Sequence, residues 1–173
     1  MIPAAAELAV GFRYPDDEAA RRLRKAVGRV PDGPVRQAFR SFVDAVTALD
    51  LAAWEELHTT TLDLNPRFAP YVGHAIWADN YQRGAFMAEL AEAQARLGVD
   101  PAGELPDHVE PILRYLAMAD PPLTSLAEVL PRALGQMRRA LVTVEPDSPY
   151  RHLLDAGLAL VADLRPVTIG GAP

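Results

Sequence analysis

The chain has 173 residues, contains no cysteine and carries a formal net charge of −6, because its 23 acidic residues outnumber its 17 basic ones. The lack of cysteine excludes disulfides, thiolate catalysis and zinc or iron–sulfur sites built on thiolates. The acidic balance argues against nucleic-acid binding, which needs a basic face.

The first apolar stretch, residues 2–12, is not a convincing signal peptide. It contains Pro3 and Glu7 and has no basic leader. No stretch of the chain approaches the roughly 20 apolar residues that a membrane span needs. We therefore expect a cytoplasmic protein without membrane insertion.

Apolar residues recur at steps of three and four through most of the chain, the spacing that lines one face of an α-helix. The six clearest stripes begin at Val35, Leu51, Phe86, Val109, Leu126 and Leu154. Sustained alternation with a period of two, typical of strands, is not evident. The sequence therefore predicts an all-α fold, a single-domain compact helical bundle of about seven or eight helices over residues 1–164. Residues 165–173 have no stripe and are expected to form a flexible tail.

Helix starts are indicated by capping-box spacing, in which a short polar residue precedes Glu or Gln by three positions. The spacing occurs at Asp79 and Gln82, at Asp107 and Glu110, and at Ser125 and Glu128. Ser148 precedes Pro149, which suits an N-cap followed by the first helical residue.

Glycine and proline indicate where helices end. Gly98 follows the stripe that ends at Leu97, and a left-handed cap favours glycine there. Prolines fall mostly between stripes, as at Pro66. Pro131 lies inside the longest stripe, so it is expected to kink that helix or split off its first turn.

No catalytic or metal-binding pattern stands out. The chain has four histidines, of which His58 lies near Asp63 and His74 near Asp79, but neither spacing matches a known metal-ligand motif. Neither a nucleophile elbow nor a glycine-rich phosphate loop is present. We expect no enzyme activity, no metal and no cofactor.

The segment over residues 57–115 concentrates aromatic and polar residues that a plain bundle does not require. Gly84 falls in an expected helix, where glycine costs about 1 kcal/mol relative to alanine, and it suggests close approach of another backbone. Arg83 beside it has two interpretations: a buried ion pair at a helix crossing, or a role in binding.

Several short elements of the chain together resemble a known family. They are Phe12-Arg-Tyr14-Pro15, Leu62-Asp63, Tyr71 with His74, Arg83-Gly84-Ala-Phe-Met87, and Glu104-Leu-Pro-Asp-His108, followed by Arg114-Tyr115-Leu116. In this order they resemble the NarJ-type respiratory nitrate reductase delta-subunit chaperones, a branch of the TorD/DmsD group. Leu62 departs from the family's Phe-Asp pair, and Arg114 stands where an acidic residue is common.

The resemblance implies a dedicated, all-helical chaperone. Such a protein binds the N-terminal segment of a molybdenum oxidoreductase catalytic subunit, nitrate reductase or a relative, and supports molybdenum cofactor insertion before membrane docking or export. The expected peptide-binding residues comprise apolar contacts, acidic contacts and polar anchors. The apolar contacts are Leu62, Tyr71, Trp77 and Met87, the acidic ones Asp63 and Asp107, and the anchors His58, His74, Arg83 and His108.

Simpler interpretations remain for individual residues, since core packing explains any single apolar one and helix capping explains Asp107. Two other functions also remain: a helical accessory subunit permanently bound to a redox complex, or a catalyst that uses the histidine–aspartate pairs. The chain itself is expected to be a monomer or weak homodimer.

Overall fold

The computed structural model describes residues 1–64, 68–162 and 164, and within these ranges the fold is all-α. The described residues form nine α-helices, with a short 3₁₀-helix η1 after the first and a π-helix η2 after the fourth. Their bounds are α1 Ala4–Ala9, η1 Val10–Phe12, α2 Ala19–Arg29, α3 Pro34–Val46, α4 Leu51–His58, η2 Thr59–Asp63, α5 Val72–Trp77, α6 Tyr81–Arg96, α7 Val109–Met118, α8 Thr124–Val144 and α9 Tyr150–Val161. The predicted fold class is confirmed, with slightly more helices than expected.

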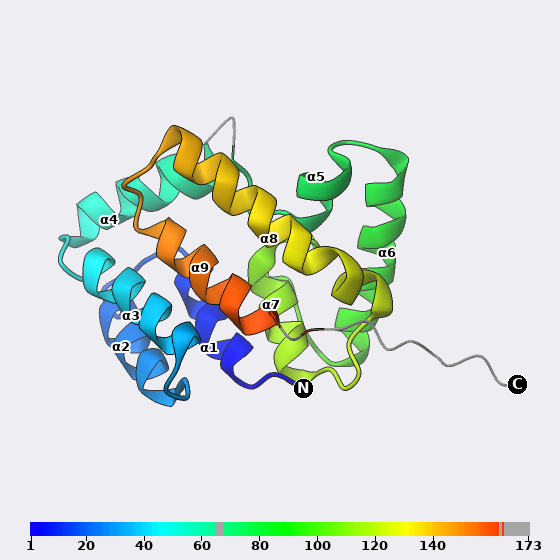
Figure 1. Ribbon diagram of the computed structural model, residues 1–173, viewed down its shortest axis with the longest axis horizontal. Helices are drawn as coiled ribbons and strands as arrows, with labels where there is room; N and C mark the ends of the chain where they lie inside the picture. Colours follow the sequence, from blue (N-terminus) through cyan, green and yellow to red (C-terminus); the bar gives the residue numbers. More distant parts are fainter. Residues whose placement is uncertain (65–67, 163, 165–173) are drawn as a thin grey trace, which may run out of the picture.

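The helices form one bundle in which the first helices pack against the last ones. Figure 1 shows α1–α4 on one side, α5 and α6 on the other, and α7–α9 between them. Helix α3 packs along α9, and α1 packs along α7. Buried side chains from every α-helix join a single hydrophobic cluster. The bundle is therefore held by contacts between segments that are distant in sequence.

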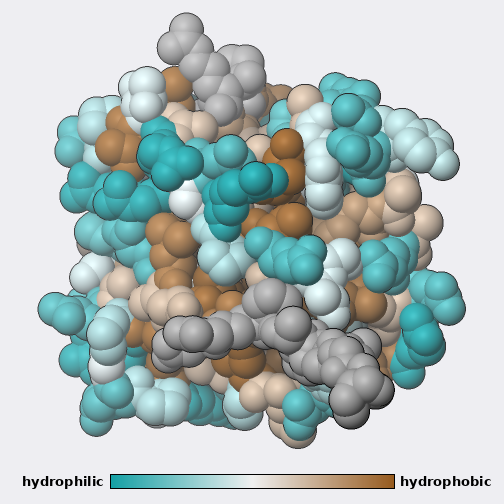
Figure 2. All heavy atoms as spheres, turned by 45° about the vertical axis from the view of Figure 1, so that its right-hand side comes forward, coloured by the Kyte–Doolittle hydropathy of each residue, from teal (hydrophilic) through white to brown (hydrophobic). Residues whose placement is uncertain are grey.

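The predicted stripes become the buried faces of the helices. In α3 the buried residues are Phe39, Phe42, Val43 and Val46, at steps of three, one and three. Their spacing places them on one side of the helix, against α9. On the face drawn in Figure 2, hydrophobic side chains also reach the surface among hydrophilic ones, as is usual for folded proteins.

The predicted N-caps were placed one or two residues away from the real ones. Helix α6 is capped by Asn80, whose side chain accepts from the Gln82 N–H at 2.9 Å, and not by Asp79. Helix α7 is capped by His108, whose Nδ1 accepts from the Glu110 N–H at 3.1 Å, and not by Asp107.

The two predicted serine caps were also wrong. Ser125 lies inside α8, and its hydroxyl donates to Glu89 Oε2 at 2.7 Å, so it ties α8 to α6. Helix α9 begins at Tyr150 with Pro149 in the cap position, and the Ser148 hydroxyl is buried without a hydrogen-bond partner.

Of the predicted helix ends, the one at Gly98 is confirmed and the possible break at Pro131 is not found. Gly98 directly follows Leu97, the C-cap of α6, and has φ +69°, a left-handed conformation that confirms its role as the terminating residue. Helix α8 runs without interruption through Pro131, so the alternative in which its first turn splits off is wrong. Pro66 and the tail over residues 165–173 lie outside the described residues.

Within the described residues, none of the helices combines the length and the apolar character that crossing a membrane requires.

Candidate functional site

One surface pocket is built from three segments that are far apart in the sequence. It has a volume of about 580 Å³. One wall comes from residues 12–14 at the end of η1, a second from the α4–η2 region, and a third from residues 101–104 together with the start of α7. Four of the predicted binding residues line it: His58, Leu62, Asp63 and His108.

The π-helix η2 forms the α4 side of this pocket. The Leu64 N–H donates to the Thr59 carbonyl at 3.0 Å, five residues back, which defines the widened turn. Thr61 and Leu62 are buried by this turn, while Asp63 is half exposed. The Thr61 hydroxyl donates to Glu145 Oε2 at 2.8 Å and thereby anchors η2 to the end of α8. The turn thus presents one apolar and one acidic side chain from neighbouring positions.

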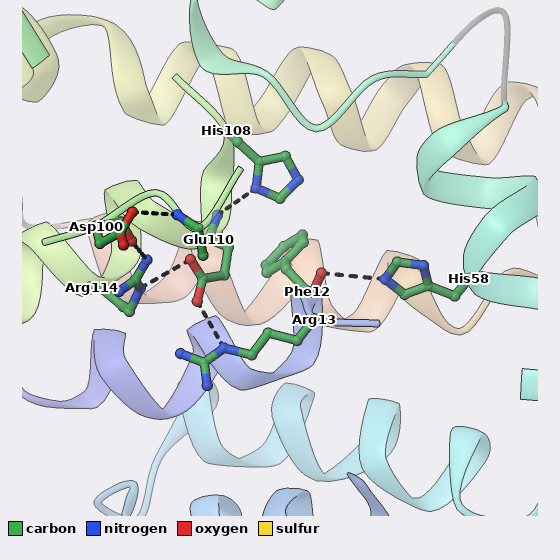
Figure 3. Close-up of polar contacts among 8 residues, drawn as sticks. Phe12, Arg13, His58, Asp100, His108, Glu110 and Arg114 are labelled. Atoms are coloured by element: carbon green, nitrogen blue, oxygen red, sulfur yellow. Dashed lines mark hydrogen bonds and ion pairs between the residues drawn. The ribbon is translucent and has the colours of Figure 1, made fainter. Parts of the chain in front are cut away.

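Four charged residues of the pocket were not predicted as binding residues: Arg13, Glu104, Glu110 and Arg114. Arg13 Nε donates to Glu110 Oε1 at 2.8 Å, and Arg114 Nε donates to Glu110 Oε2 at 3.0 Å (Figure 3). Arg13 and Glu110 are 97 positions apart, so no spacing rule joins them. The sequence signal for Arg13 and Arg114 was that they lie within short elements that resemble the family, and Glu110 lies two residues after the element that ends at His108.

Beside the pocket, Arg83 and Asp107 form a buried ion pair. Arg83 donates to both oxygens of Asp107, from Nε at 2.9 Å and from a terminal amino group at 3.4 Å. The Asp107 side chain is 0% exposed, and Arg83 is 13% exposed. Arg83 also lies 5.6 Å from the centre of the Tyr71 ring, and it pairs with the exposed Asp79 at 3.1 Å. The ion-pair interpretation of Arg83 is therefore confirmed.

This pair corrects two expectations about Asp107. It is not a helix cap, and its carboxylate is inaccessible to a partner because both oxygens are paired and buried. A buried carboxylate in a bidentate pair has a structural role, since it compensates the guanidinium that it holds.

The close backbone approach suggested for Gly84 does not occur, and the glycine that is closely approached is Gly73, by side chains. A Cβ on Gly84 would meet nothing within 4 Å. A Cβ on Gly73 would lie 2.7 Å from Asp107 Oδ2 and 2.9 Å from Arg83 Cγ. Helix α5 therefore needs a residue without a side chain where it passes over the ion pair. Hydrogen bonds from the Val72 N–H to the Asp107 carbonyl and from the Val109 N–H to the Pro70 carbonyl join the same segments.

The remaining predicted residues lie outside the pocket. Tyr71 does not line the pocket, but it contacts two residues that do. Its hydroxyl donates to Glu104 Oε2 at 3.0 Å, and its ring packs edge-on against His108. Trp77 packs against Phe86 between α5 and α6, with ring centres 5.1 Å apart. His74 faces Asp79 at 3.5 Å, and Met87 is half-buried on α6. The predicted set is thus divided between the pocket and the α5–α6 side.

The two pocket histidines are buried, and burial lowers the pKa of each below its ordinary value of 6.5. At His58 this lowering of the pKa is opposed by the hydrogen bond from Nε2 to the Phe12 carbonyl and by the carboxylates of Asp63 and Glu104. Glu104, Glu110 and Asp107 oppose it at His108, while His58 adds to it. Both rings are therefore neutral at pH 7. Since a carbonyl only accepts, the proton of His58 lies on Nε2 and its Nδ1 is an acceptor.

We expect the protein to lose stability as the pH falls below about 6.5, because the unfolded histidines then take up protons that the folded ones resist. Urea unfolding at pH 7.5, 6.5 and 5.5 measures this loss. His108→Asn keeps an oxygen to cap α7 and removes one titrating group, so the dependence should become shallower. An unchanged slope in this variant would contradict the assignment to His108. Burial also lowers the pKa of His152, so this residue contributes to the pH dependence in both proteins.

In the parts of the chain that are described, no group of three or more His, Cys, Asp or Glu side chains is arranged to hold a metal ion. Asp63 lies 3.9 Å from His58 Nδ1, and His74 pairs separately with Asp79. The two histidine–aspartate pairs lie on different elements, the first on α4 and η2 and the second on α5 and the turn after it. They therefore do not combine into one site.

Comparison with protein families and with curated proteins adds no relative. No protein-family model matches the chain. No curated protein is significantly similar to it. The function is therefore argued from the pocket and its chemistry.

Proposed function

We propose that this chain is a cytoplasmic maturation chaperone, not an enzyme, that binds the N-terminal segment of a molybdenum oxidoreductase catalytic subunit in the η1–η2–α7 pocket. The observation that carries the proposal is the pocket itself, which combines buried apolar side chains with half-exposed charges at its rim. In this role the chaperone holds its client while molybdenum cofactor is inserted, before membrane docking or export.

The apolar part of the pocket suits one face of an amphipathic segment. Phe12 and Leu62 line it and are each 5% exposed, so they form a fixed floor. Tyr14 lines it as well and is 53% exposed. Leu64 and Leu105 are also exposed and directly follow lining residues, so apolar surface continues beyond the rim. Grooves that accept amphipathic peptides combine a fixed apolar floor with such peripheral contacts.

The acidic part of the pocket suits basic residues of the client. Asp63 is 51% exposed, and Glu104 is exposed with one oxygen bound to the Tyr71 hydroxyl. The two carboxylates come from different segments and line the same pocket. A basic amphipathic leader therefore meets an apolar floor and an acidic rim at once, which favours both affinity and fast association.

Asp63→Asn should weaken binding of the client's N-terminal segment by about two- to fivefold, because it removes one partly exposed charge without changing shape. Calorimetric titration of the protein with a synthetic peptide of that segment measures the effect. The peptide carries the N-terminal sequence of a molybdenum oxidoreductase catalytic subunit from the same organism. Raising the salt concentration should reduce the difference between the two proteins.

Asp44→Asn is the matched control, because Asp44 is an exposed aspartate on α3 away from this pocket. Binding should be unchanged in that variant. Absence of binding to the folded parent protein would remove leader recognition as the mechanism.

A permanently bound accessory subunit is the second candidate, because the exposed apolar residues around the pocket also suit a lasting interface. The two candidates differ in what happens after cofactor loading. A chaperone is released from the mature enzyme, whereas an accessory subunit remains in the purified complex.

A further inference from the structure

Two arginines converge on a single carboxylate in the α7 wall of the pocket. Arg13 and Arg114 each donate an Nε–H to a different oxygen of Glu110, at 2.8 and 3.0 Å. The Glu110 side chain is 9% exposed and both of its oxygens accept a charged donor. Two guanidinium groups against one carboxylate leave this cluster with a formal charge of +1.

The two arginines have N–H donors that make no hydrogen bond to the described residues. Among the described residues, only Glu110 accepts a hydrogen bond from the Arg13 side chain, and it does so from the Nε–H. The terminal amino groups of Arg13 therefore remain available, and the side chain is 47% exposed. Arg114 also donates to the Asp100 carbonyl, which fixes its direction (Figure 3). Glu110 orients both guanidinium groups before any ligand arrives, and such preorganisation lowers the cost of binding.

His108 adds a neutral donor on the same side. Its Nδ1 accepts the Glu110 N–H, so its proton lies on Nε2. Figure 3 shows this nitrogen on the edge of the ring that is turned away from Glu110, facing the space toward His58. Arg13, from the wall at the end of η1, and Arg114 and His108, from the α7 wall, therefore present donors to the same side of the pocket.

The opposite wall presents acceptors. His58 donates Nε2–H to the Phe12 carbonyl at 3.3 Å, which leaves its buried Nδ1 as a lone-pair acceptor without a hydrogen-bond partner. The Asp63 carboxylate lies 3.9 Å from that nitrogen. Figure 3 places Phe12 between His58 and the Arg13–Glu110–Arg114 cluster. Hydrogen-bond donors thus lie on the Arg13–Arg114 side of Phe12 and acceptors on the His58–Asp63 side, while Glu104, bound to the Tyr71 hydroxyl, adds a further carboxylate at the rim.

We infer that Arg13, Arg114 and His108 form a carboxylate subsite, and that the recognised segment carries an acidic residue for this wall as well as a basic residue for the Asp63 side. This inference rests on the proposed function, since it specifies the chemistry of the peptide that the pocket takes. Paired arginine donors suit a carboxylate because the planar guanidinium binds its two oxygens together. A peptide with charges of only one sign leaves one wall unpaired.

The first experiment tests the subsite without a client. Acetate is titrated into the ¹⁵N-labelled full chain, and the arginine Nε–H and histidine ring signals are followed by NMR. Saturable shifts of Arg13, Arg114 and His108 are expected, with affinity falling about fivefold or more in Arg13→Gln. Arg29→Gln is the matched control, because Arg29 is 57% exposed and also pairs with a glutamate, Glu7 at 3.6 Å.

Shifts that do not saturate, or that are equal in the parent and Arg13→Gln, would overturn the subsite. Inorganic phosphate is titrated in parallel, and tighter binding of phosphate at the same residues would overturn the assignment to a carboxylate. Arg13→Lys keeps the charge but loses the planar fork, so it should retain part of the affinity.

The second experiment uses the client peptide. Changing its acidic residue to the amide should weaken binding to the parent by about tenfold and have little further effect on Arg13→Gln, since both changes remove one contact. If the peptide binds parent and Arg13→Gln equally, the subsite is wrong and the chaperone proposal stands. If acetate binds as expected and the peptide does not bind, the chaperone proposal fails and the subsite stands.

Discussion

Asp107→Ala is expected to lower the free energy of unfolding by about 3 kcal/mol or more, the usual cost of breaking one side of a buried ion pair. The carboxylate is 0% exposed and holds Arg83 through two hydrogen bonds. Its removal leaves a guanidinium that is 13% exposed with only the solvent-facing Asp79 as an acidic partner. Urea unfolding followed by circular dichroism measures the loss.

The matched control is Asp79→Ala, which removes the other carboxylate paired with the same arginine. Asp79 is 86% exposed, so its loss should cost about 0.5 kcal/mol or less. The double variant Arg83→Met/Asp107→Leu removes both charges together and should recover part of the stability lost in Asp107→Ala. Equal effects of Asp107→Ala and Asp79→Ala would show that the buried pair does not hold the α5, α6 and α7 segments together.

Gly73→Ala is expected to destabilise the protein by about 1–3 kcal/mol, although alanine favours helices more than glycine does. The added methyl group would lie 2.7 Å from Asp107 Oδ2 and 3.3 Å from Phe86 Cδ1. Both neighbours are buried, so the ion pair or helix α5 must move. Thermal and urea unfolding of the variant test this cost.

Gly84→Ala is the control for helix propensity, since Gly84 lies on the exposed side of α6 with open space around it. This variant should gain up to about 1 kcal/mol. A gain at both glycines would mean that the backbone of α5 yields freely, and that the contact at Gly73 does not constrain the fold.

The fold class was predictable because most helices bury a continuous stripe of large apolar side chains. Helices α3, α4 and α6–α9 each follow such a stripe. Helix α2 did not produce one, since it buries Leu23 and Val27 together with small alanines amid a run of basic residues. Helix α5 has only six residues, too few to establish a period. Local patterns thus revealed the long helices and missed the short or weakly apolar ones.

The capping errors have a common origin. In α6 and α7 an acidic residue stands directly before the true cap, as Asp79 does before Asn80. In each helix the predicted cap satisfies the capping-box spacing, and the true cap lies only one residue further on. The residue at which the backbone turns into the helix decides which of the two acts as the cap. At α7 the choice depends on tertiary structure, because Arg83 draws the Asp107 carboxylate away from the helix end and His108 supplies the cap. Capping patterns alone do not contain that information.

The candidate site was only half predictable for a similar reason. His58, Leu62, Asp63 and His108 were chosen from a segment rich in unusual residues, and the fold brings all four to one pocket. Arg13 reaches the same pocket only because η1 packs against α7. Its contact with Glu110 depends on the closed bundle and not on any local periodicity.

The packing of α1 against α7 and of α3 against α9 also sets when the pocket forms during synthesis of the chain. Residues 12–14 leave the ribosome early, but their partners in the pocket extend to Arg114, and α3 waits for α9 to cover it. A nascent chain that stops short of α7 has Arg13, just after η1, without the Glu110 carboxylate that orients it. Under the proposed function, a client peptide would therefore find its complete pocket only after α7 has been synthesised and has packed against the segment before α2.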